Sequence, residues 1–200
     1  MSWFFDDGLF RLVLAVLSAG IYINHHYIHR SPHKAKGPLV GVEFWMVMFL
    51  LIWTLMIILY VIGLIGFARA ALPQWLRWTG VGVMVACIPL SSWIYHTLGV
   101  HFSKKLELRA DHRLINTGPY RFVRHPMYAT LFLCATGVCL ISANLLIAAA
   151  TVPVAIVMLV RMRKEEKMLV SRFGAAYITY RQYTGALFPK LLQWRNGTAV

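Results

Sequence analysis

The feature that most constrains this chain is the apolar run at residues 44–67, which contains no charged side chain. A helix needs roughly 20 mostly apolar residues to cross a bilayer, and this run is long enough. Hydrophobic residues make up 59% of the 200-residue chain and charged residues only 14%. A soluble domain of this size could not hide so much apolar surface in one core. We therefore expect an integral membrane protein.

Three further apolar blocks accompany this run, at residues 9–23, 78–98 and 127–160. The last block is too long for one crossing, and the sequence Ser-Ala-Asn at residues 142–144 offers a turn within it. A hairpin of two short helices is therefore predicted there. The expected fold is all-α, an integral membrane helical bundle of about five transmembrane helices.

The charges of the loops predict the orientation of the chain. Asp6 and Asp7 stand where a cleavable signal peptide would carry basic residues, so the first apolar block is expected to be a retained span. Lysine and arginine favour the cytoplasmic side of a membrane, and they are concentrated in alternate connections and in the tail beyond residue 160. The expected topology places the N-terminus outside and the C-terminus in the cytoplasm.

The net charge of +13 at pH 7 also bears on partners. The basic residues gather in short segments next to apolar runs, as expected of loops that face an anionic membrane surface. Nucleic acid is the weaker interpretation, because no basic groove interleaved with stacking aromatic residues is evident. The expected partner is the lipid bilayer, and no nucleic acid.

The cysteines and histidines do not predict a metal site. Cys87, Cys134 and Cys139 lie inside apolar blocks without the spacing of a zinc site or a disulfide framework, and are expected to pack. Four histidines lie close together in residues 25–33, where a helical spacing could bring some of them onto one face. They are His25, His26, His29 and His33. Because no carboxylate or cysteine accompanies them, we interpret this segment as basic and interfacial.

Beyond residue 160 the sequence changes from apolar to a mixture of charged and aromatic residues. Phe173, Tyr177 and Tyr180 follow a spacing of four and three, which places them on one stripe of a helix, and Arg172 and Arg181 lie on its other face. This pattern predicts a C-terminal amphipathic helix on the cytoplasmic surface.

Two polar segments flank the predicted hairpin, which would bring them together. The first contains "RHPMY", where Pro126 suits the first position of a helix, and His125 and Tyr128 would share the N-terminal end of that helix. An anionic group could bind there. The alternative is that the arginines only reach the lipid boundary and Tyr128 belongs to an aromatic belt.

The second segment contains Arg161, Glu165 and Glu166, at the point where the last span would leave the membrane. The simple interpretation is an Arg161–Glu165 ion pair on a solvated helix, worth about 0.3–0.5 kcal/mol. The residues alone leave this interpretation and a functional one open for both segments.

The order of these motifs resembles the isoprenylcysteine carboxyl methyltransferase family, which is related to phospholipid N-methyltransferases. The motifs are "LGVHFS", "DHRLINTGPYRFVRHPMYA" and "RMRKEEKMLVSRFGAAYITYRQYTGALFPKL". The likeness covers residues 98–191, which predicts a cofactor-binding and catalytic half there. Residues 1–97 would form N-terminal transmembrane helices that select the substrate, and residues 192–200 would form a tail.

The resemblance implies a membrane enzyme that takes S-adenosylmethionine from the cytosol and transfers its methyl group to a lipophilic acceptor. The residues that correspond to the family's cofactor site are His112, Leu114, Gly118, Tyr120, His125, Pro126, Tyr128, Glu165 and Glu166. Arg161 and Glu166 correspond to the arginine and glutamate associated with the acceptor, and they are the expected catalytic residues. Thr130 and Leu131 depart from the family, which has small residues after RHPxYx.

The acceptor stays open between a prenylcysteine carboxylate, an aminophospholipid, and an isoprenoid or quinone-like lipid. Two alternative functions also remain. A membrane sterol or isoprenoid reductase would bind NADPH with a similar half, but Pro126-Met127 and "RKEE" favour the methyltransferase. A transporter or scaffold would be expected to carry ionisable groups along a midplane pathway, whereas here they lie at one membrane face.

Overall fold

The computed structural model describes residues 2–28, 41–98 and 114–190. The described part of the chain is built from α-helices, with two isolated bridges in place of a sheet. The all-α prediction is therefore confirmed. His112, His29 and His33 lie outside the described residues.

Three long helices come first: α1 (Ser2–Ile28), α2 (Val42–Val61) and α3 (Gln74–Leu98). All three are long and apolar enough to cross a membrane. The apolar run at 44–67 does not continue as helix to its end. Beyond α2 the chain turns through hydrogen bonds such as that from the Leu64 amide to the Leu59 carbonyl, at 2.9 Å.

The predicted hairpin is present as α4 (Pro126–Ser142) and α5 (Leu145–Phe173). The second helix is not short as predicted, because its 29 residues continue through the polar stretch beyond residue 160. Ala143 adopts a left-handed conformation with φ of 45°, and the Asn144 side chain caps α5 by accepting from the amides of Leu146 and Ile147 at 3.0 and 3.3 Å. The Ser-Ala-Asn turn is therefore confirmed. α5 is the fourth helix that is long and apolar enough to cross a membrane, and α4 is a shorter apolar helix.

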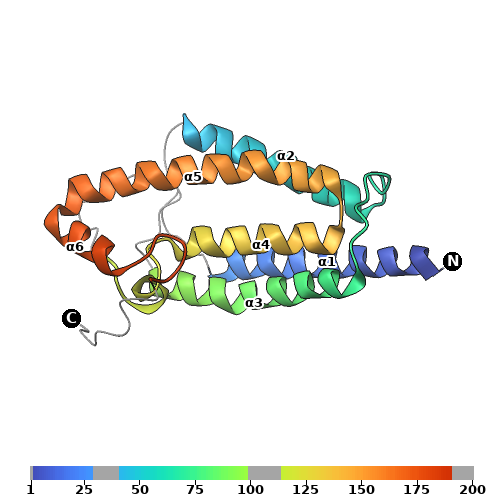
Figure 1. The fold of residues 1–200 in the computed structure, drawn as a ribbon, viewed down its shortest axis with the longest axis horizontal. Helices are drawn as coiled ribbons and strands as arrows, with labels where there is room; N and C mark the ends of the chain where they lie inside the picture. Colours follow the sequence, from blue (N-terminus) through green and yellow to red (C-terminus); the bar gives the residue numbers. More distant parts are fainter. Residues whose placement is uncertain (1, 29–40, 99–113, 191–200) are drawn as a thin grey trace.

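The helices form two layers, with α1, α3 and α4 in one and α2 and α5 in the other (Figure 1). Within the first layer α3 and α4 approach closely at two glycines. A Cβ on Gly80 would lie 2.7 Å from Leu140 Cβ, and a Cβ on Gly137 would lie 2.7 Å from Met84 Cγ. Small residues allow such close helix packing in membranes.

The tail helix differs from its prediction in one respect. Phe173 ends α5, and Gly174 with φ of 53° separates it from α6 (Ala175–Tyr183). The spacing predicted that Phe173, Tyr177 and Tyr180 share one helical stripe. This prediction is wrong for Phe173, because the helix breaks at Gly174. α6 folds back at the end of the bundle where α4 begins (Figure 1).

Candidate active site

The segment before α4 is shaped by a short 3-10 helix, η2 (Gly118–Arg121). Gly118 begins it with φ of 57°, and a Cβ there would lie 2.6 Å from Thr97 Oγ1 at the end of α3. His125 is then the N-cap residue of α4, and Pro126 occupies its first turn. A proline is tolerated there because its missing N–H would have had no partner within the helix.

The chain after α6 lies along this segment. The amide of Arg124 donates to the Gly185 carbonyl at 2.8 Å, and the amide of His125 donates to the Ala186 carbonyl at 3.0 Å. The Tyr180 hydroxyl donates to the Tyr120 carbonyl at 2.6 Å. These bonds bring together the two polar segments that the sequence predicted to be neighbours.

Glu166 lies at the centre of the cluster. Its Oε1 accepts from Arg124 Nε at 2.9 Å and Nη2 at 2.7 Å, and it lies 3.3 Å from His125 Nε2. Its Oε2 lies 3.7 Å from Arg181 Nη2 on α6. The Arg124 guanidinium also donates to the Thr184 carbonyl. One carboxylate from α5 therefore joins α4, α6 and the tail.

Glu165 reaches the same helix start through a different partner. The Tyr128 hydroxyl donates to Glu165 Oε2 at 3.0 Å. The His125 and Tyr128 rings are 5.6 Å apart in an edge-on arrangement. The two side chains of "RHPMY" therefore lie together, and each faces one of the adjacent glutamates.

The tyrosines around the cluster stay protonated at neutral pH. Burial, with the nearby negative charge of Glu165, raises the pKa of Tyr120 well above its usual range. Burial also raises the pKa of Tyr177 to about 12 and, together with the neighbouring Tyr177, raises the pKa of Tyr180. Because a raised pKa keeps a phenol neutral, none of these hydroxyls is suited to act as a base, and that of Tyr180 serves as a hydrogen-bond donor.

Arg161 lies on α5 about one turn before Glu165, and it is 7% exposed. Its Nη1 is 3.2 Å from Met46 Sδ on α2, so the guanidinium sits between two helices. This burial contradicts the simple interpretation of a solvated surface pair.

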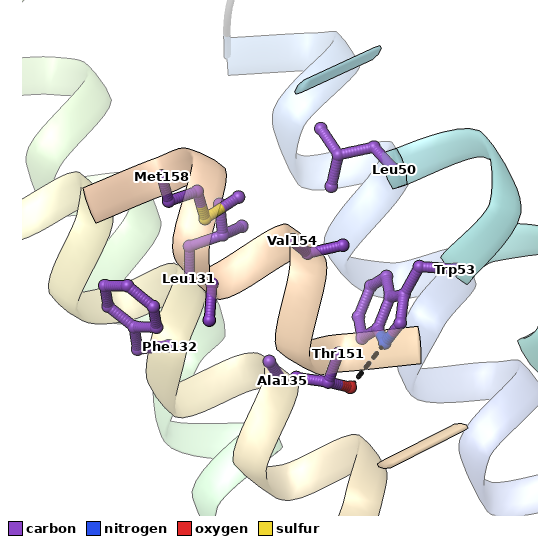
Figure 2. A pocket seen from close by; sticks show the side chains of 9 residues that line it. Leu50, Trp53, Leu131, Phe132, Ala135, Thr151, Val154 and Met158 are labelled. Carbon is purple, nitrogen blue, oxygen red and sulfur yellow. Dashed lines mark hydrogen bonds between the residues drawn. The ribbon is translucent and has the colours of Figure 1, made fainter. Parts of the chain in front are cut away.

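An apolar pocket lies on the membrane side of the cluster, between α2, α4 and α5 (Figure 2). Trp53 Nε1 donates to Thr151 Oγ1 at 2.9 Å within its wall. The residues that line it are Leu50, Trp53, Leu131, Phe132, Ala135, Thr151, Val154, Ala155 and Met158.

The pocket and the polar cluster follow one stripe of α5. Thr151, Val154 and Met158 line the pocket, and the same spacing of three and four continues to Arg161 and Glu165. At about 1.5 Å per residue, Thr151 and Arg161 are roughly 15 Å apart along the helix axis. A long apolar group attached to a polar head could span this stripe.

The predicted cofactor residues divide into three groups. His125, Pro126, Tyr128, Glu165 and Glu166 come together at the start of α4. Gly118 and Tyr120 border this cluster, with Tyr120 bonded to α6 through its carbonyl, and Leu114 lies half-buried at the start of its described segment. His112 lies outside the described residues.

Some residues of the cluster were not among the predicted site residues. Arg124 was considered only in the alternative in which the arginines reach the lipid boundary, and in the structure it is the main partner of Glu166. Arg181 and Thr184 are also partners in the cluster. The position of Arg124 next to His125 was the available signal. For Arg181 and Thr184 no local pattern indicated a role.

The position that departs from the family pattern, Thr130, is accommodated within the helix packing. Its hydroxyl donates to the Pro126 carbonyl at 2.9 Å, and its carbonyl lies 3.8 Å from Cys87 Sγ on α3. Thr130 is buried, and the hydrogen bond to the Pro126 carbonyl gives its hydroxyl a partner within α4.

Parts of this chain are similar to known proteins. Residues 80–171 match the model of the isoprenylcysteine carboxyl methyltransferase (ICMT) family. The chain is ICMT-like. The protein-S-isoprenylcysteine O-methyltransferase of Saccharomyces cerevisiae is 34% identical over 105 residues, which is 47% of this chain and 41% of that protein. The enzyme of the same name from Tribolium castaneum is 33% identical over 119 residues, 58% of this chain and 42% of that protein.

The fold of the ICMT-like chain is also similar to a solved structure. The eukaryotic intramembrane Ras methyltransferase ICMT matches with a TM-score of 0.58 and 24% identity, over 89% of this chain and 64% of that chain. This likeness supports the helical membrane fold. The ICMT-like chain spans less than half the length of the two curated relatives.

Proposed function

We propose that this ICMT-like chain is a membrane methyltransferase that uses S-adenosylmethionine and a lipophilic acceptor. The observation that carries the proposal is the cluster of Arg124, His125, Tyr128, Glu165 and Glu166. These residues come from the two motif segments and all lie within the family match at 80–171, and they come together at one end of the bundle.

The chemistry of the cluster fits this cofactor. S-adenosylmethionine carries a sulfonium, an ammonium and a carboxylate, and the cluster offers two adjacent carboxylates, a guanidinium and aromatic rings. Glu165 and Glu166 would hold its positive groups, aromatic faces such as Tyr128 suit a cation, and Arg124 suits its carboxylate. When bound, the cofactor supplies an electrophilic methyl group. We propose His112, Leu114, Gly118 and Tyr120 as further cofactor residues on the family pattern.

Arg161 is proposed to orient the acceptor. Its planar guanidinium can bind a carboxylate through two parallel hydrogen bonds. Its position between the cluster and the apolar pocket would place a polar head near the cofactor and an apolar tail against Met158 and Val154. Burial excludes water, which favours a reaction in which a carboxylate and a sulfonium lose their charges.

The surroundings of Glu166 favour a carboxylate acceptor over an amine. An amine would have to lose a proton, and Glu166 is the proposed base among the site residues. Its Oε1 already accepts from Arg124 and lies 3.3 Å from His125. A carboxylate stabilised by such donors is poorly suited to take a proton. O-methylation needs no base, so Glu166 serves to hold Arg124 and the cofactor.

Binding and product analysis test the proposed activity. Calorimetry of the full chain in detergent should detect S-adenosylmethionine binding and no binding of NADPH. Incubation with labelled cofactor and lipid extracts, followed by mass spectrometry, should then identify a methylated lipid or a methylated prenylcysteine. Binding of NADPH alone would identify a reductase, and binding of neither would favour a transporter or scaffold.

We also propose that the N-terminus lies outside and the C-terminus in the cytoplasm. The start of α4, the end of α5 and α6 meet at one end of the bundle, and the α4–α5 turn lies at the other (Figure 1). Among the described residues, lysines and arginines are concentrated at the α6 end. Cysteine-accessibility labelling should place Asn144 and Val200 on opposite sides, and the same side for both would refute five crossings.

A further inference from the structure

A second charged cluster lies at the opposite end of the bundle from α6. Arg77 on α3 donates from Nη1 to Asp7 Oδ1 at 3.0 Å, from Nη2 to the Tyr60 hydroxyl at 3.1 Å and from Nε to the Ile141 carbonyl at 3.0 Å. Its guanidinium carbon lies 3.8 Å from the centre of the Phe10 ring. These contacts join α1, α2, α3 and α4, which accounts for Arg77 and Asp7 as structural residues.

Two further arginines converge on the second oxygen of the same carboxylate. Arg69 Nη2 pairs with Asp7 Oδ2, and Arg11 Nη2 lies 3.8 Å from it. One carboxylate therefore faces three guanidinium groups. Even when Asp6, the sequence neighbour of Asp7, is counted, the three arginines outnumber the two aspartates at this end. Charges next to a membrane require counter-charges, because burial without one is costly.

The side chains of Arg11 and Arg69 are partly exposed at the surface of the protein, whereas that of Arg77 is buried. Their side chains are 25% and 37% exposed, against 8% for Arg77. A Cβ on Gly63 would lie 2.7 Å from Arg11 Nη1, and a Cβ on Gly66 would lie 2.9 Å from its Nη2, so the two glycines leave room for this guanidinium. Arg11 Nε is buried and has no hydrogen-bond partner among the described residues.

We propose that Arg11 and Arg69 together bind the phosphate of an anionic membrane lipid, in the leaflet opposite to the candidate active site. Both guanidinium groups approach Asp7 Oδ2, and Arg11 also lies over the Tyr60 ring, 5.5 Å from its centre. The N–H groups of Arg11 and Arg69 that face neither Asp7 nor Tyr60 are close enough to share a second anion. A phosphodiester has a tetrahedral phosphorus with two non-bridging oxygens, which can accept hydrogen bonds from two planar guanidinium groups. The lipid phosphate supplies the missing negative charge where helix ends meet headgroups. This site does not depend on the proposed methyltransferase activity.

Native mass spectrometry of the full chain tests the proposal. The delipidated protein in neutral detergent is titrated with phosphatidylglycerol, with diacylglycerol as a phosphate-free lipid and with inorganic phosphate as a free anion. Phosphatidylglycerol should bind in preference to both. Arg69→Gln and Arg11→Gln should each weaken this binding about tenfold or more, because each removes hydrogen bonds to a charged group.

Arg163→Gln is the matched control, since Arg163 is exposed near the opposite end of α5 and should leave binding unchanged. Circular dichroism melting checks that each variant is folded. Raising the salt concentration is a second test that needs no variant, and it should weaken the binding of phosphatidylglycerol to the wild-type chain. Equal binding by wild type, Arg69→Gln and Arg11→Gln would overturn the proposal. Equal competition by inorganic phosphate would overturn the assignment to a lipid.

Discussion

The two ends of this bundle each gather arginines around one carboxylate, but they do so with different parts of the chain. At one end Asp7, which is 5% exposed, is bound by arginines from α1, α3 and the α2–α3 connection. At the other end the Glu166 side chain, 17% exposed, is bound by Arg124 before α4 and Arg181 on α6.

The difference shows how similar charge groupings serve different purposes. The Asp7 cluster cross-links membrane helices, with Arg77 fully enclosed among Asp7, Tyr60 and Ile141. The Glu166 cluster is assembled from a loop and a tail, and an apolar pocket continues from it along α5. We expect the first cluster to govern stability and the second to govern chemistry. Four predictions test this contrast, from the largest expected effect to the smallest.

Replacing Arg77 should have the largest effect. Arg77→Ala removes three hydrogen bonds and leaves Asp7 without its enclosed partner, which should cost about 3–5 kcal/mol of unfolding free energy. The matched control is Arg181→Ala at the other end, whose side chain is 45% exposed and should cost about 1 kcal/mol or less. Denaturant titration in detergent measures both. Equal losses would remove the distinction between the two ends.

Replacing Arg161 should reduce turnover without a comparable loss of cofactor affinity. Alignment of the acceptor is realised mainly in the transition state, so Arg161→Ala should lower the rate at saturating cofactor by about 100-fold, or 2.7 kcal/mol. Arg161→Lys should not restore it, because an ammonium lacks the planar fork. The exposed Arg163→Ala is the control. Similar rates in all four proteins would refute the proposed role of Arg161.

Replacing His125 or Tyr128 should weaken cofactor binding. His125→Ala removes a contact with Glu166, and Tyr128→Phe removes the hydrogen bond to Glu165. Each should cost about 1.5–3 kcal/mol of binding free energy in calorimetry with S-adenosylmethionine, the range for hydrogen bonds to charged groups. Unchanged affinity in both variants would favour the interpretation of Tyr128 as an aromatic-belt residue.

The smallest effect is expected where the tail docks. Tyr180→Phe removes the bond from its hydroxyl to the Tyr120 carbonyl and should cost about 1 kcal/mol. Amide exchange of residues 180–186 should quicken, because this bond helps to hold the tail against the segment before α4. Tyr183→Phe is the control, since Tyr183 is 58% exposed. Unchanged amide exchange in Tyr180→Phe would show that the backbone hydrogen bonds hold the tail without help from the Tyr180 hydroxyl.

The helices of this protein could be predicted from local sequence, and their ends less well. Apolar runs predicted α1, α2 and α3, and the Ser-Ala-Asn turn predicted the division between α4 and α5. The stripe through Phe173 was wrong because Gly174 breaks the helix, and the spacing of apolar residues does not register such a break.

The site was predicted only in part. The motif residues His125, Tyr128, Glu165 and Glu166 came from a sequence pattern, and the structure brings them together. Arg181 and Thr184 had no local signal, because their contacts with the cluster depend on how α6 folds back.

The sequence by itself determined that this chain is a membrane bundle, because apolar length and charge patterning act locally through the energetics of the bilayer. It also determined the match of residues 80–171 to the ICMT family. Only the tertiary structure decided which arginine meets which carboxylate. The chain separates Asp7 from Arg77, and Arg124 from Glu166, by long stretches, and only helix packing brings these opposite charges close enough to pair.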